Sequence, residues 1–184
     1  MAKPRSPEFD KFVAEKKRVL IILWLAFLAA PFAYIGIAFF LMKEHPPVDQ
    51  KFLVVLGAMS VFSGIGSLVI PWVLFSENRL RAWLRKDPGE SAVRCAPFLS
   101  DMQSLAPAEQ RVALLLARYQ MGFMFTMALA EGVAIYGLVA VVIGASRMAY
   151  LFFGIPSILL VAAQRPQVDR LLENLESLEP IEPL

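Results

Sequence analysis

The sequence predicts an all-α fold, an integral membrane bundle of four transmembrane helices, and three observations favour this class. Of the 184 residues, 58% are hydrophobic and 18% are charged, whereas soluble domains average roughly 45–50% apolar and about 25% charged residues. The apolar residues fall in four blocks, and the basic residues gather on alternate sides of these blocks. This excludes a soluble single domain and a disordered chain. The single Cys excludes a disulfide scaffold.

The four apolar blocks approach or exceed the length of a membrane span. A hydrocarbon core of about 30 Å requires about 20 helical residues, and each of the first three blocks has 24. The fourth block, 149–163, spans if Arg147 and Gln164 lie at the two interfaces, and a re-entrant segment is the alternative. The expected spans are listed by residue number: about 19–42, 52–75, 121–144 and 148–164.

The basic residues orient these spans. Fifteen of the 18 Lys and Arg residues lie in the N-terminal segment 1–18, the loop 76–120 or the tail 165–184, and three lie in the other two loops. Because positive loops stay in the cytoplasm, both termini are predicted to be cytoplasmic. The first block is longer than the h-region of a cleaved signal peptide, so we interpret it as a signal anchor. Short loops favour a bacterial inner (plasma) membrane.

The segments outside the spans also show helical patterns. Helix two is expected to continue through 76–86, and Pro107 suits the first position of a third helix that has no breaker before Gly144. Helices two and three would therefore extend into the cytoplasm. The tail places apolar residues at helical spacing opposite acidic ones (Val168, Leu171, Leu172, Leu175 and Leu178). It is either an interfacial helix that covers the bundle's cytoplasmic end or a helix that docks a partner.

The sequence lacks the patterns of an enzyme or of a nucleic-acid-binding protein. His45 and Cys95 are the only residues of their types, and they lie on opposite sides of the predicted membrane. A metal or catalytic site needs converging ligands, so we expect no metal, no cofactor and no catalysis. The net charge of +2 favours no nucleic acid. The expected partners are the lipid bilayer, further copies in a homo-oligomer, or a protein bound through the cytoplasmic loop or tail.

One ionisable residue lies inside an apolar block. Glu131 is the only one of the 16 Asp and Glu residues in such a block, near the middle of the third. A charged carboxylate there costs at least about 2.5 kcal/mol, and low dielectric favours the neutral acid. The other spans contain no Lys, Arg or His, so a neutral carboxyl bonded to a hydroxyl or a backbone carbonyl is expected. The candidate hydroxyl partners are Ser60, Ser63, Ser67, Tyr34 and Tyr136.

Small residues surround Glu131 along the chain. They recur four residues apart in two pairs on the third block and two on the second: Ala128 with Gly132, Ala130 with Ala134, Ser60 with Gly64, and Ser63 with Ser67. This spacing lets helix backbones approach closely. We therefore expect the second and third spans to pack together, with Glu131 at or just outside their contact.

The segment from Ala130 to Leu138 resembles the ion-binding helix of the c subunits of rotary ATP synthases. It has a central Glu, then a small residue, then an Ile-Tyr-Gly-Leu run. Gly64-Ile65-Gly66 and the turn Arg85-Lys86-Asp87-Pro88 resemble the rest of the c-subunit hairpin. The resemblance implies that Glu131 binds a proton or cation and that Tyr136 is the nearby aromatic residue.

Two functions follow from these features. The first is proton or cation binding by Glu131 within a c-subunit-like hairpin, with Tyr136 and Ser63 beside it. Two additional spans and a long linking loop favour a c-like helix inside a different small membrane protein. The alternative is a structural or interaction protein of the membrane without transport or catalysis, in which Glu131 serves helix packing.

Overall fold

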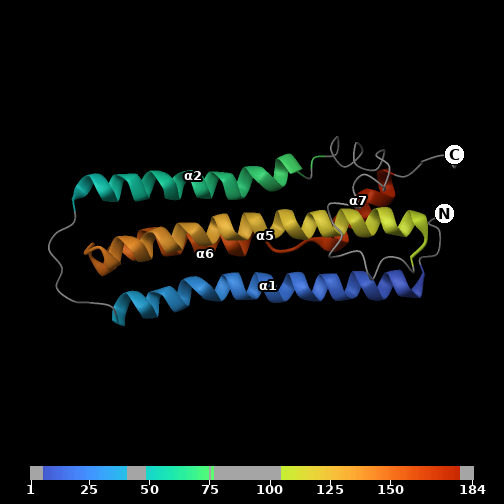
Figure 1. The fold of residues 1–184 in the computed structure, drawn as a ribbon, viewed down its shortest axis with the longest axis horizontal. Coiled ribbons are helices and arrows are strands. Elements are labelled where there is room, and N and C mark those ends of the chain that lie inside the picture. The colour runs from blue at the N-terminus through green and yellow to red at the C-terminus, as the bar shows by residue number, and fades with distance from the viewer. Residues whose placement is uncertain (1–5, 41–48, 75, 77–104, 179–184) are drawn as a thin grey trace. The chain divides into compact units, whose positions relative to one another are not determined.

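The computed structural model describes residues 6–40, 49–74, 76 and 105–178, and the elements within these ranges are all helices (Figure 1). They are α1 (Pro7–Phe40), α2 (Gln50–Leu74), α5 (Pro107–Val142), α6 (Arg147–Ala163) and α7 (Val168–Leu178). The predicted all-α class is confirmed for this part of the chain. Of the helix expected over 76–86, the structure describes Ser76, which is not helical, and residues 77–86 lie outside the described residues.

Three helices are long and apolar enough to cross a membrane. These are α1, α2 and α5. Helix α6 has 17 residues, about 25 Å at 1.5 Å per residue, which is shorter than a hydrocarbon core of about 30 Å. It passes the same test only together with α7, across a bend of 42°. Within the described ranges, three helices are therefore able to span, or four with this bent pair.

The residues group into two compact units, and α1 and α5 each contribute to both. Unit 1 contains Met1–Ile21, Val73–Gly122 and Pro166–Leu184, and unit 2 contains Ile22–Trp72 and Phe123–Arg165. In both helices the boundary follows shortly after the last basic residue, Arg18 in α1 and Arg118 in α5. The units thus separate charged helix segments from apolar ones.

Unit 1 packs in the manner of a water-soluble helical domain. Its buried side chains are apolar and come from α1, α5 and α7. They include Phe9, Phe12, Leu116, Leu171 and Leu172. Its charged residues are mostly exposed, among them Lys11, Glu15, Arg111 and Glu173. Burial of apolar groups away from water accounts for this arrangement.

Two helices of unit 1 begin at one shared polar cluster. Ser6 caps α1, since its Oγ accepts a hydrogen bond from the Phe9 N–H at 3.2 Å. The Ser6 N–H and hydroxyl donate to the Glu109 carboxylate at 2.8 and 2.9 Å, and the Ala106 N–H donates to it at 3.3 Å. Because α1 starts at Pro7, residues 7–18 are helical and continue without a break into the first apolar block. Helix α5 begins at Pro107, where the sequence predicts its start.

The amphipathic tail forms α7 and packs within unit 1. Its predicted apolar face is buried at Val168, Leu171, Leu172 and Leu175, and Leu178 lies where side chains are not described. The Lys17 ammonium pairs with the Asp169 carboxylate at 2.5 Å, and the Gln167 N–H donates to the Tyr119 hydroxyl at 3.0 Å. The apolar face of α7 is therefore covered by this chain itself.

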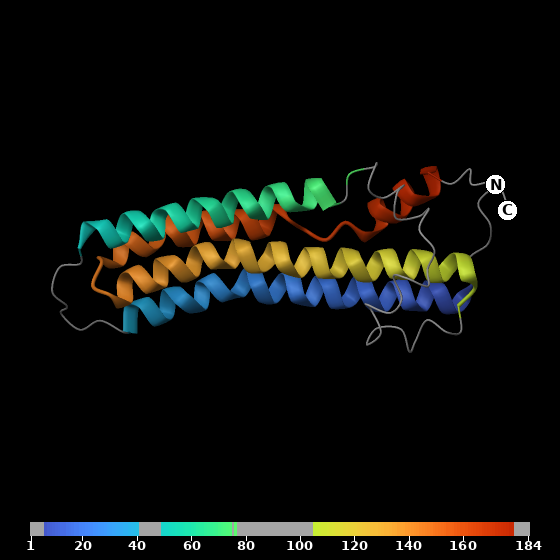
Figure 2. The ribbon, with the colours of Figure 1, turned by 45° about the horizontal axis from the view of Figure 1, so that its top comes forward.

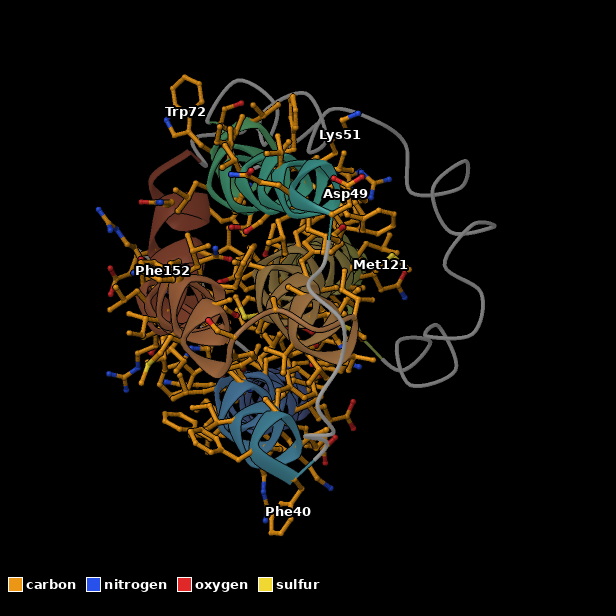
Figure 3. All side chains as sticks on the ribbon, turned by 90° about the vertical axis from the view of Figure 1, so that its left-hand side faces the viewer. Phe40, Asp49, Lys51, Trp72, Met121 and Phe152 are labelled. Atoms are coloured by element: carbon orange, nitrogen blue, oxygen red, sulfur yellow. The ribbon has the colours of Figure 1, made fainter. Side chains whose placement is uncertain are left out.

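Unit 2 shows the reverse burial pattern. Exposed large apolar side chains in the described residues lie in unit 2, apart from Val19, Ile21 and Met121 near its boundary. Phe40, Trp72 and Phe152 point away from the helices and are 93%, 80% and 80% exposed (Figure 3). The buried stripe of α2, in contrast, contains two serines, Ser63 and Ser67. Apolar side chains outside and small polar ones inside are typical of a helix bundle in lipid.

Within unit 2, α5 and α6 lie between α1 and α2 (Figure 2). The link between α5 and α6 is short because α5 ends at a Schellman turn. Gly144 adopts a φ of 109°, and the N–H groups of Gly144 and Ala145 donate to Val141 and Ala140 carbonyls at 3.0 and 2.9 Å. The turn makes α6 an antiparallel neighbour of α5.

Helices α5 and α6 approach each other closely at Gly137. A Cβ added there would lie 2.6 Å from the Phe153 Cβ, an atom next to the backbone that cannot swing aside. Gly137→Ala should therefore destabilise the fold by about 1–3 kcal/mol, the usual cost of overpacking. This loss is measurable as a lower Tm in detergent.

Gly57→Ala is the matched control for this substitution. No atom lies within 4 Å of a Cβ added at Gly57, which is also inside a helix. Because alanine favours helix over glycine by up to about 1 kcal/mol, Gly57→Ala should keep or raise the Tm. Equal Tm values for the two variants would contradict the close α5–α6 contact.

Candidate functional site

Glu131 lies in the middle of the unit 2 part of α5, at the edge of that helix's buried face. One side of the helix is fully buried at Met127, Ala130 and Ala134, and the other is exposed at Ala128 and Ile135. Glu131 itself is half-buried. The carboxyl is therefore placed at the border between the helix contacts and the outer apolar surface.

Tyr34 of α1 holds the Glu131 side chain. The Tyr34 hydroxyl donates a hydrogen bond to the Glu131 carboxylate, which ties α1 to α5. Tyr34 packs with Leu138 against a buried cluster of Ala38, Val141 and Tyr150. The phenol is thus fixed on one side by apolar contacts and on the other by the acid.

Tyr150 of α6 joins the same region from a third helix. Its ring is 2% exposed, and its hydroxyl donates to the Pro31 carbonyl of α1 at 2.7 Å. A Cβ at Gly154 would lie 2.6 Å from a Tyr150 ring atom, so this glycine makes room for the ring. Tyr34 and Tyr150 therefore connect α1 to α5 and to α6, respectively.

The predicted packing residues of α2 lie on its face toward α5 and α6. Ser63 is buried, and its Oγ is 3.9 Å from a Cβ added at Gly132. The corresponding position at Gly64 is 3.5 Å from Leu160 and 4.0 Å from Val133. The second and third spans are therefore in contact at Ser63, Gly64 and Gly132.

Ser67 and Ser60 continue the same α2 face. Ser67 is fully buried; its hydroxyl donates to the Gly64 carbonyl at 2.9 Å and accepts from the Gln164 side-chain amide at 3.2 Å. Ser60 is half-buried. Ser67 thus joins α2 to the residue that follows α6, while the hydrogen bond to Glu131 comes from α1.

Two predicted site residues occupy positions outside this cluster. Tyr136 is half-buried and is five residues from Glu131, which places it about 140° around the helix from the carboxyl. Ala128 is exposed, and the small pair that is fully buried on α5 is Ala130 with Ala134. The structure thus pairs Glu131 with Tyr34, one of the five hydroxyl candidates, and turns Tyr136 away from it.

Three further polar contacts between helices were not predicted from the sequence. The Tyr150 hydroxyl is the first, the Trp24 indole N–H donates to the Val161 carbonyl at 2.8 Å, and the fully buried Ser157 hydroxyl donates to the Ala130 carbonyl at 2.8 Å. The sequence indicates such contacts only through residue type, because a Trp or Tyr buried in a span requires a hydrogen-bond acceptor. Their partners are backbone carbonyls, which the sequence does not distinguish.

The described residues hold no group of three or more His, Cys, Asp or Glu side chains that could bind a metal. Comparison of the chain with protein-family models, curated protein sequences and solved structures finds no match. The chemistry of the site therefore rests on its own geometry, one carboxyl and one phenol from neighbouring helices.

Tyr34→Phe should destabilise the protein because it removes the bond that ties α1 to α5. A hydrogen bond within a membrane bundle contributes about 0.5–1.5 kcal/mol. Tyr136→Phe removes an equivalent hydroxyl from the other side of α5 and serves as the control. We expect a lower Tm for Tyr34→Phe and an unchanged one for Tyr136→Phe; the reverse order would contradict the site geometry.

Proposed function

We propose that the protein uses the Glu131 carboxyl to bind and release a proton or cation within its membrane bundle. The observation that carries this proposal is the Tyr34–Glu131 hydrogen bond. A carboxyl held by a phenol from another helix is fixed in place and can still change charge. Acids inside membrane spans are rare and usually functional. The resemblance of the segment from Ala130 to Leu138 to the c-subunit ion-binding helix supports the same function.

The proposed topology has four spans, with α6 crossing the bilayer and both termini in the cytoplasm of a cell with an inner membrane. The excess of basic residues in segments 1–18, 76–120 and 165–184 supports this orientation. The exposed apolar surface of unit 2 supports contact with lipid, and the soluble-like packing of unit 1 suits the aqueous side. Further copies of the chain or a protein bound to unit 1 remain the proposed partners.

Single cysteines test this topology. In a Cys95→Ala background, Lys51→Cys and Glu173→Cys place one thiol each at exposed positions near the start of α2 and on α7. A membrane-impermeant maleimide should label Lys51→Cys in intact cells and Glu173→Cys only after the membrane is permeabilised. Labelling of both in intact cells would contradict four spans.

A hydrophobic carbodiimide tests the binding function. Such reagents modify protonated carboxyls in apolar surroundings, and mass spectrometry locates the modified residue. We expect modification of Glu131 at low pH, loss of modification as the pH rises, and none in Glu131→Gln. Absence of modification of Glu131 at every pH would contradict a reversibly protonated site.

A structural role for Glu131 is the second candidate, and a specific observation favours it. Ser157 and Trp24 join helices by hydrogen bonds to backbone carbonyls, which do not titrate and serve structure alone. The Tyr34–Glu131 hydrogen bond joins two helices in the same way. Glu131→Gln discriminates between the two functions, because the amide oxygen still accepts from Tyr34. A purely structural acid predicts that the Tm difference between this variant and the wild type is the same at every pH. A binding site predicts that this difference changes with pH, whereas the pH dependence contributed by unit 1 acids such as Glu109 is common to both proteins.

A further inference from the structure

Several hydroxyl groups of unit 2 already donate to acceptors within the protein. The Tyr34 hydroxyl donates to the Glu131 carboxylate, and the Tyr150 hydroxyl donates to the Pro31 carbonyl. Ser67 and Ser157, the fully buried serines of α2 and α6, donate to the Gly64 and Ala130 carbonyls. Glu131 is thus bonded to one phenol, and the described residues hold no group of three or more His, Cys, Asp or Glu side chains.

A proton and a metal cation make different demands on such a site. Hard metal cations in proteins take about six or more oxygen ligands, and Mg²⁺ requires them in near-octahedral geometry. A proton requires a single carboxyl oxygen. Resting on the function proposed above, we infer that Glu131 binds a proton and not a metal cation, and that Tyr34 positions the carboxyl for it.

The Tyr34 contact is compatible with both protonation states. With Glu131 ionised, the phenol donates to a carboxylate oxygen. Uptake of one proton forms one O–H bond on the carboxyl and breaks none in the protein, and the phenol still donates to the remaining carbonyl oxygen. The phenol therefore keeps its hydrogen bond to the carboxyl in either state and holds it in place.

In the described part of unit 2, Tyr34 is the titratable group that hydrogen-bonds to Glu131. Tyr34 faces Glu131 from α1, and Tyr150 packs against Tyr34 from α6. The remaining charged residues in the described part of unit 2 lie at helix ends: Asp49 and Lys51 at the start of α2, Arg147 at the start of α6, and Arg165 after its end. No basic side chain is therefore available within the spans to stabilise the carboxylate in place of Tyr34.

The test is the pH profile of carbodiimide modification of Glu131, measured with and without sodium chloride and lithium chloride. Wild type, Tyr34→Phe and the matched control Tyr136→Phe are compared as full-length protein in detergent. We expect one midpoint that neither salt moves. In Tyr34→Phe the midpoint should shift, since the carboxyl loses the phenol that donates to it. Tyr136→Phe should match the wild type.

Three results would overturn the inference, and they are distinguishable. Protection of Glu131 by sodium or lithium at constant pH would identify a metal cation site, which contradicts the proton assignment and leaves the proposed binding function standing. Equal midpoints in Tyr34→Phe and wild type would show that Tyr34 does not position the carboxyl. Absence of modification at every pH would remove both this inference and the proposed function.

Discussion

The hydrocarbon interior of a bilayer offers no hydrogen-bond partner to a protein, so polar groups in the spans of unit 2 have to be satisfied from within. Four side chains meet this constraint across helix contacts: Trp24, Tyr34, Tyr150 and Ser157. Three of the four bonds join α1 to its neighbours, and three involve α6. Because lipid provides no hydrophobic force between helices, these bonds and the close contact at Gly137 hold the bundle together. The apolar side chains are then free to face outward.

One of these four bonds differs from the other three in its acceptor. Trp24, Tyr150 and Ser157 donate to backbone carbonyls, whose charge never changes, whereas Tyr34 donates to a carboxyl. The same contact is thus a structural tie in one respect and a titratable site in another. The structural role and the proposed binding role of Glu131 therefore share one geometry, and pH, which alters only the carboxyl among these four acceptors, distinguishes them. Its position at the border of the buried face leaves the acid reachable from the apolar surface.

Much of the fold follows from sequence patterns that have one physical meaning. Apolar length gives α1, α2 and α5, Pro107 marks the start of α5, and the spacing of Val168, Leu171 and Leu172 gives the buried face of α7. The start of α1 at Pro7 was not predicted, because the cap at Ser6 precedes a charged segment and not an apolar block. Glu131 was identified because a charge in an apolar block is costly. Its partner was not, because five hydroxyls were candidates. Helical spacing turns Tyr136 away from Glu131 on the same helix, but only the placement of α1 and α2 around α5 selects Tyr34 over the three serines.

We propose that Glu131 changes its protonation state while Tyr34 remains its hydrogen-bond partner. Infrared difference spectroscopy of the protein in lipid, recorded between low and high pH, observes the carboxyl directly. We expect a carboxylic-acid C=O band at low pH that disappears at high pH. This band should be absent in Glu131→Gln and should change frequency in Tyr34→Phe. A wild-type difference spectrum without a band attributable to Glu131, or a band unaffected by Tyr34→Phe, would contradict it.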